Sequence, residues 1–97
     1  MCELLKSVII PNSVETIEYG AFYGCTNLTH VIIPDSVKTI QGEAFNGCPN
    51  LTHIAIPDSV INIGNYAFYE CSSLREVSIP SHLEKQVKTN KVFPDHT

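Results

Sequence analysis

Apolar residues recur along this chain with a period of 23 residues, and four prolines mark the register. Pro11, Pro34, Pro57 and Pro80 are spaced 23 residues apart, and most apolar positions keep the same spacing. A fixed period of about 20–50 residues is typical of a solenoid, in which each repeat buries its apolar side chains against its neighbours. The pattern therefore predicts a stack of similar coils.

One complete repeat runs from Leu28 to Asn50 and reads L-x-x-V-x-I-P-x-S-V-x-x-I-x-x-x-A-F-x-x-C-x-x. Its first part alternates apolar and polar residues and is rich in β-branched residues, which predicts a short strand over residues 28–33. Pro34 cannot donate a backbone hydrogen bond, so it ends this strand. The S-V-x-x-I part predicts a second short extended or turn-like piece over residues 36–40.

The Y-G-A-F-Y-G-C segment, residues 19–25, and its later copies predict one helical or 3-10 turn in each repeat. Gly24 and Gly47 are placed to end that turn. Glu70 stands at the same position in the next repeat, which indicates that the position does not always require a positive φ angle.

The repeat sorts the apolar residues into columns, which we expect to stack as ladders inside the solenoid. No single coil could bury so many apolar groups, so stacking must do it. The predicted core columns are Leu5, Leu28, Leu51 and Leu74; Val8, Val31, Ile54 and Val77; Ile10, Ile33, Ile56 and Ile79; Val14, Val37, Val60 and Leu83; Ile17, Ile40 and Ile63; Ala21, Ala44 and Ala67; Phe22, Phe45 and Phe68; and Cys2, Cys25, Cys48 and Cys71.

This set of motifs resembles the BspA-like, or Treponema pallidum-type, leucine-rich repeat over residues 2–83. The resemblance implies an α/β protein with a right-handed leucine-rich-repeat solenoid of about four 23-residue turns. It also implies a parallel β-sheet on the concave face, with short strands and 3-10 or helical turns on the convex side. Proteins of this family are often secreted or on cell surfaces and take part in adhesion and protein binding.

Composition narrows the functional classes. Ten acidic residues against six basic ones give a net charge of −4, and no basic stripe is present, so nucleic-acid binding is not expected. No apolar run approaches the length of a membrane span. The first residues already follow the repeat pattern and do not show the charged segment and apolar segment of a signal peptide. We therefore expect either that the protein acts in the cytoplasm or that this chain is a piece of a larger or processed protein.

Four cysteines in a short chain often indicate disulfides, but here all four occupy one repeat column. We therefore predict free, buried thiols that act as small apolar groups. Cys2 is the expected exception, because it lies at the exposed first turn.

The repeat pattern decays after Pro80, where we predict a C-terminal cap. We place the solenoid at residues 1–83 and the cap helix with its tail at residues 84–97. Ser81 to Glu84 reads S-x-x-E, the pattern of a capping box, and a short helix through about Asn90 would follow.

Three lysines of this cap, Lys85, Lys88 and Lys91, form either a solvated face or a contact for an acidic partner. The segment 92–94 either docks on the core or trails free. The N-terminus has no comparable cap, so its strand edge predicts a dimer or higher oligomer.

The exposed strand positions are the candidate binding site. Ile9 and Ile32 would be large apolar groups in solvent, either for binding or for strand propensity alone. The predicted concave-face residues are His30, His53, Glu76, Ile9, Ile32, Thr29, Thr52 and Arg75.

Two stacked histidines with Glu76 nearby invite three interpretations: a plain polar surface, a pH-sensitive patch or a zinc site. C-x₄-H occurs at Cys25/His30 and Cys48/His53, but the repeat produces this spacing, and we expect the two side chains to point to different sides. We predict no metal or other cofactor. The N-x-T sequons at Asn27 and Asn50 are interpreted as side chains that bond local backbone.

The sequence contains no Gly-rich phosphate loop and no nucleophile elbow, and every candidate catalytic residue belongs to a repeat column. The prediction is a non-enzymatic module that binds a protein partner through its concave strand face. The alternative is a structural module that self-assembles through the solenoid ends. A metal-dependent hydrolase using His30, His53 and Glu76 is a third hypothesis.

Overall fold

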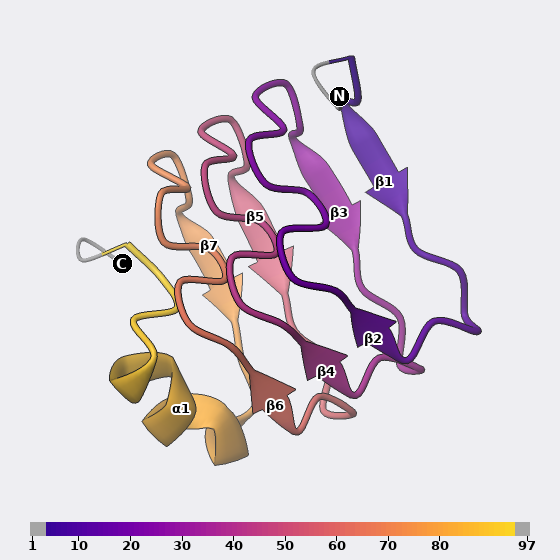
Figure 1. Ribbon diagram of the computed structural model, residues 1–97, viewed down its shortest axis with the longest axis vertical. Helices are drawn as coiled ribbons and strands as arrows, with labels where there is room; N and C mark the ends of the chain where they lie inside the picture. The colour runs from indigo at the N-terminus through magenta and orange to yellow at the C-terminus, as the bar shows by residue number, and fades with distance from the viewer. Residues whose placement is uncertain (1–3, 95–97) are drawn as a thin grey trace.

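Two rows of short parallel strands build the molecule, shown in Figure 1. The computed structural model describes residues 4–94. The first row holds β1 (Ser7–Ile9), β3 (His30–Ile32), β5 (His53–Ala55) and β7 (Glu76–Ser78). The second row holds β2 (Thr16–Ile17), β4 (Thr39–Ile40) and β6 (Asn62–Ile63). The predicted stack of coils with parallel strands is confirmed.

Every strand pair keeps the 23-residue register of the sequence. Val8 lies opposite Val31 in the β1–β3 pair, Ile17 opposite Ile40 in the β2–β4 pair, and Ile54 opposite Val77 in the β5–β7 pair. Because the register equals the repeat length, each residue stacks on its own column, and like side chains contact like.

The first row is less continuous than predicted. β1 pairs with β3 and β5 pairs with β7, whereas β3 and β5 lie side by side without a ladder between them. The second row pairs continuously in the order β2-β4-β6. Between the coils of β3 and β5 a side chain provides a link, because Asn50 Nδ2 donates to the carbonyl of Thr26 at 2.7 Å.

The repeated prolines open turns as well as end strands. In each coil the carbonyl of the proline accepts a hydrogen bond from the N–H three residues later, at 3.0–3.2 Å. The four donors are the residues of one core column, Val14, Val37, Val60 and Leu83. The proline therefore ends the strand and places the next buried side chain.

Consecutive turns, and no helix, form the third part of the first three coils. Glycine adopts a positive φ at Gly24 (70°) and Gly47 (82°) as predicted, and Glu70 does not. Alternate N–H groups donate within the coil, as from Tyr23 to Gly20, and to the next coil, as from Phe22 to the carbonyl of Ala44 at 2.7 Å. Because half of the donors serve the next coil, this segment cannot continue as a helix.

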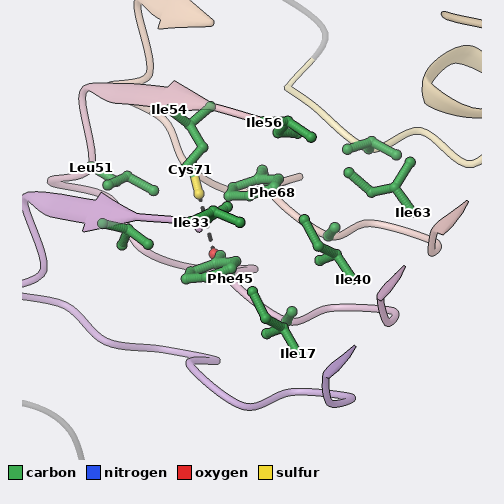
Figure 2. Packing of buried hydrophobic residues seen from close by; sticks show 14 of the residues in the cluster. Ile17, Ile33, Ile40, Phe45, Leu51, Ile54, Ile56, Ile63, Phe68 and Cys71 are labelled. Atoms are coloured by element: carbon green, nitrogen blue, oxygen red, sulfur yellow. Dashed lines mark hydrogen bonds between the residues drawn. The ribbon is translucent and has the colours of Figure 1, made fainter. Parts of the chain in front are cut away.

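Stacked phenylalanines form the centre of the core (Figure 2). Ring centroids are separated by 5.0 Å from Phe22 to Phe45 and by 4.9 Å from Phe45 to Phe68. The pattern placed Lys91 where the next phenylalanine would stand. Phe93, two residues later, takes that place at 5.4 Å from Phe68, so the ladder has one more ring than the repeat predicts.

The cysteine prediction is correct for two residues and wrong for a third. Cys48 and Cys71 are free and fully buried, and their thiols donate to the carbonyls of Phe22 and Phe45 at 3.3 and 3.2 Å. Cys25 is disulfide-bonded. A repeat column brings successive cysteines within bridging range, so side-chain direction decides whether a bond forms. The prediction for Cys2 lies outside the described residues.

The last coil ends in a 3-10 turn, η1 (Ser81–Leu83), followed by the helix α1 (Glu84–Thr89), which lies beside β6 (Figure 1). The predicted capping box is wrong. The helical turn begins one residue early, so Pro80 is the N-cap of η1 and Leu83 that of α1, and neither makes a side-chain cap bond.

Side chains of the segment 82–90 form hydrogen bonds with backbone groups at and near the open edge of β6. Gln86 Oε1 accepts from the N–H of Ile63, and Gln86 Nε2 donates to the carbonyl of Ile61. Asn90 Nδ2 donates to the carbonyl of Ile63, and His82 Nε2 donates to the carbonyl of Val60. The segment therefore acts as a cap for the second row of strands.

Of the two alternatives for residues 92–94, docking on the core is the observed one. Val92 and Phe93 are buried, and the carbonyl of Val92 accepts from the N–H of Phe68 at 2.7 Å. The division of the chain at residue 83 stays a prediction.

Candidate functional site

The outward face of the first strand row carries the candidate binding residues. Each strand of this row buries or half-buries its central residue and exposes the two residues beside it. The exposed positions are Ser7 and Ile9 on β1, His30 and Ile32 on β3, His53 and Ala55 on β5, and Glu76 and Ser78 on β7.

Two isoleucines form the apolar part of this face. Ile9 is 77% exposed and Ile32 is 60% exposed, and they lie opposite each other in the β1–β3 pair. β-Branched residues are common in strands, and a single exposed one needs no explanation. Two in register make a contiguous apolar surface on one pair of strands.

On the other pair of strands, His53 and Glu76 form an ion pair between His53 Nε2 and Glu76 Oε1. The side chains are 62% and 72% exposed, so the pair adds little to stability and is accessible to a partner. The hydroxyl of Thr52 lies 2.7 Å from His53 Nδ1. Threonine and glutamate thus hold the imidazole from both sides and fix its direction.

His30 is held in a related way, by the threonine that precedes it. The Thr29 hydroxyl donates to the carbonyl of Lys6 at 3.0 Å. Its 2.8 Å contact with His30 Nδ1 therefore requires the proton on Nδ1. In its neutral form His30 presents an acceptor, Nε2, to solvent, whereas His53 uses Nε2 as the donor to Glu76. The two histidines of one column are thus chemically different.

A shallow hollow lies over β5 and β7. His53, Glu76 and Arg75 line it, with Ala55 and Ser78 farther along the strands. The structure therefore brings Thr52, the ion pair and Arg75 together on one half of the face. Ile9, Ile32, Thr29 and His30 lie on the other half.

Residues 4–94 contain no group of three or more His, Cys, Asp or Glu side chains that could hold a metal ion. The C-x₄-H pairs are divided as expected, because Cys48 is buried in the core and His53 is exposed on the strand face. No helix within the described part of the chain is long and apolar enough to cross a membrane.

The interpretation of the sequons needs one correction. Asn50 does bond backbone, but its partner is Thr26 of the preceding coil and not a local group. The 23-residue stacking brings this distant carbonyl close, which a turn-based argument could not show.

Sequence reasoning missed a group of tyrosines on the turn segments. Tyr19 and Tyr66 are exposed, and Tyr66 contacts Tyr69 edge-on with ring centroids 5.2 Å apart. The Tyr19 hydroxyl donates to Glu43 Oε2 at 3.0 Å, and this bond, with the carboxylate charge, raises the pKa of Tyr19. The available signal was that all four tyrosines of the chain fall in the segments around A-F.

The comparisons with known proteins agree with this architecture. The family described as BspA type leucine rich repeat region matches residues 1–91. A leucine rich cell surface protein from Faecalibacterium prausnitzii is 43% identical, with a TM-score of 0.76, over 78% of this chain and 20% of that one. A leucine-rich repeat protein from Bacteroides ovatus is 34% identical, with a TM-score of 0.55, over 81% of this chain and 26% of that one.

The chain therefore spans about a fifth to a quarter of the length of these two relatives. No curated protein matches it.

Proposed function

The chain belongs to the BspA-type leucine-rich repeat family, and from this premise we propose that it is a non-enzymatic module that binds a protein partner through the outward face of its first strand row. Leucine-rich repeats are in general protein-interaction modules. One similar structure is described as a cell surface protein, which supports an adhesion or interaction role at a surface.

One observation carries the proposal: the in-register pair Ile9 and Ile32, exposed on the same strand row as the His53–Glu76 ion pair. Protein interfaces combine an apolar centre with a polar, charged rim. The two halves of this face supply these parts on a rigid backbone. The proposed contact residues are His30, His53, Glu76, Ile9, Ile32, Thr29, Thr52 and Arg75.

The test compares capture of partners by three proteins: the unaltered chain, a face variant and a control. The face variant carries Ile32→Asp and His53→Asp, both at exposed positions, so its stability should change little. The control carries Ile61→Asp, because Ile61 is also exposed, at 56%, but lies beside the second strand row. Loss of capture in the face variant alone supports the proposal, and equal capture by all three proteins contradicts it.

The second candidate is self-assembly through the first coil. Val8, Val14 and Phe22 are only partly buried, and they line an open groove at this end of the solenoid. A second copy could cover these side chains. Light scattering over a range of concentrations tests this candidate, and a strict monomer at high concentration excludes it.

A further inference from the structure

The C-terminal cap closes only part of the last coil. It pairs the edge of β6 through Gln86 and Asn90 and extends the phenylalanine stack through Phe93. It does not provide a strand beside β7, which pairs with β5 alone within residues 4–94. Within the described residues the first strand row therefore ends in an open edge beside the cap.

Burial of the core columns shows the same gap. Ile54 and Ile56 on the β5 coil are 3% and 4% exposed. Their successors in the columns, Val77 and Ile79, are only partly buried. These two side chains have no neighbouring coil in the described residues that would cover them as β7 covers β5.

The backbone of β7 has hydrogen-bonding groups directed toward this gap. The N–H of Glu76 donates to Thr52, and the carbonyl of Ser78 accepts from Ile56, so residues 76 and 78 face β5. Alternate residues of a strand direct their N–H and C=O to opposite edges. The N–H and C=O of Val77 therefore point to the open edge, where an added strand would find them.

The far wall of the gap is formed by the cap. A groove of about 430 Å³ is lined by Val77 and Ile79 on one side and by the cap on the other. The cap residues in this lining are Val87, Lys88, Lys91, Phe93 and Pro94. The floor is apolar, and both charged groups in the lining are ammonium groups.

We propose that this groove binds an extended, acidic segment of a partner protein, added as a parallel or antiparallel strand beside β7. The Val77 backbone would supply the ladder bonds, as in other cases of strand addition. Alternate apolar side chains of the segment would cover Val77 and Ile79. Carboxylates between them would meet Lys88 and Lys91, whose charge selects an acidic segment.

Local charge favours such a partner over a second copy of this chain. The chain has a net charge of −4, yet three of its six basic residues are Lys85, Lys88 and Lys91 on the cap. A second copy would offer either residues 5–10, which carry Lys6 and no carboxylate, or its own β7, which lies beside the same two lysines. Either edge would add positive charge to a groove that already has two ammonium groups.

The experiment uses the full chain and a labelled short peptide of alternating valine and glutamate. The matched peptide has lysine in place of glutamate. Binding is measured by fluorescence anisotropy at low salt, and exchange of the Val77 amide hydrogen is followed by NMR. The acidic peptide should bind and slow Val77 exchange, whereas the lysine peptide should bind at least tenfold more weakly.

A charge-reversed variant, Lys88→Glu with Lys91→Glu, should lose about tenfold in affinity for the acidic peptide, because two attractive rim charges become repulsive ones. Lys85→Glu is the control, because Lys85 lies on the same helix but does not line the groove. If charge reversal unfolds the cap, the neutral pair Lys88→Gln with Lys91→Gln replaces it and should give a smaller loss.

Three outcomes would overturn the proposal. The first is equal binding of the two peptides. The second is binding that leaves Val77 exchange unchanged, which would place the peptide elsewhere. The third is protection of Val77 without peptide that grows with protein concentration, which would make a second copy the occupant. None of these outcomes depends on the face variant of Ile32 and His53, so this groove and the strand face are tested separately.

Discussion

The side chain of Gln86 takes the place of a neighbouring strand for the backbone of Ile63. Its Oε1 accepts the N–H of Ile63 at 2.9 Å, where the preceding coils use a backbone carbonyl, and its Nε2 donates to the carbonyl of Ile61 at 2.8 Å. The repeat pattern places an isoleucine at residue 86, so this glutamine departs from its column. A primary amide has both an acceptor and a donor, which lets one side chain satisfy two groups of the open edge of β6.

Gln86→Ile should therefore destabilise the protein although it restores the repeat residue. The N–H of buried Ile63 would lose its partner, which costs about 2 kcal/mol in the free energy of unfolding. Urea denaturation measures the change. Gln86→Glu keeps an acceptor for Ile63 and should cost less. An isoleucine variant as stable as the parent would show that the cap does not depend on this bond.

Phe93→Ala should remove the last ring of the phenylalanine stack and cost about 3 kcal/mol. Phe93 is buried and stacks on Phe68, so its loss opens a cavity at the end of the core. Phe93→Leu retains most of the volume and should cost clearly less. If both substitutions leave the unfolding midpoint unchanged, residues 92–94 do not contribute to stability in solution.

The buried thiols of Cys48 and Cys71 should not react with a thiol reagent in the native state. Both are fully buried and donate to backbone carbonyls. Hydrogen bonding with Cys48, followed by burial, raises the pKa of the Cys71 thiol, so little reactive thiolate forms there, and Cys48 is protected by its burial. Labelling followed by mass spectrometry should show modification of these residues only in denaturant. Rapid labelling without denaturant would contradict the buried positions.

The periodic pattern was sufficient to predict the coils, the parallel strands and most of the core columns, because each depends on a residue type that recurs every 23 positions. Leu5 and Ala21 were predicted as core and are exposed, because no preceding coil in the described residues covers the first one. Glu70 was also interpreted correctly. In contrast, the cap depends on single residues that occur once. Gln86 and Asn90 act through their amides, and Phe93 reaches the stack by a two-residue shift, which no period could show.

The candidate site was predictable only as a list of exposed positions. Alternation along each strand placed His30, His53 and Glu76 outward correctly. It could not show that Thr29 and Thr52 orient the two histidines, because those contacts depend on side-chain rotamers. Nor could it show the missing ladder between β3 and β5, since both strands carry the same pattern.

Tyrosine ionisation should reveal the bond between Tyr19 and Glu43. The pKa of Tyr19 lies above its ordinary value of 10.0, because its hydroxyl donates to the Glu43 carboxylate and its phenolate would be repelled by it. Glu43→Gln should lower the pKa of Tyr19 toward that value. An ultraviolet pH titration, with Tyr19→Phe to identify the transition, measures the shift.

The sign of the effect on stability follows from the same bond. The folded pKa of Tyr19 is the higher one, so its stabilising contribution is complete below the unfolded pKa and is lost as pH rises through the folded pKa. Glu43→Gln should reduce this dependence of the unfolding midpoint above pH 10.0. An unchanged titration in the glutamine variant would show that the contact does not persist in solution.

Gly64→Ala should be among the most damaging small substitutions in the chain. A Cβ atom at Gly64 would lie 2.5 Å from the backbone nitrogen of Gly42 and 2.9 Å from its Cα, so two coils would have to separate. Overpacking of this kind costs about 1–3 kcal/mol, and backbone atoms cannot move aside as a flexible side chain can.

Gly24→Ala is the matched control, because a Cβ there meets nothing within 4 Å and the cost comes from its φ of 70° alone. That conformational cost is about 1–2 kcal/mol. Thermal unfolding of the two variants should rank Gly64→Ala below Gly24→Ala. The reverse order would mean that the coils can separate at Gly42 more easily than the turn at Gly24 can change its backbone angle.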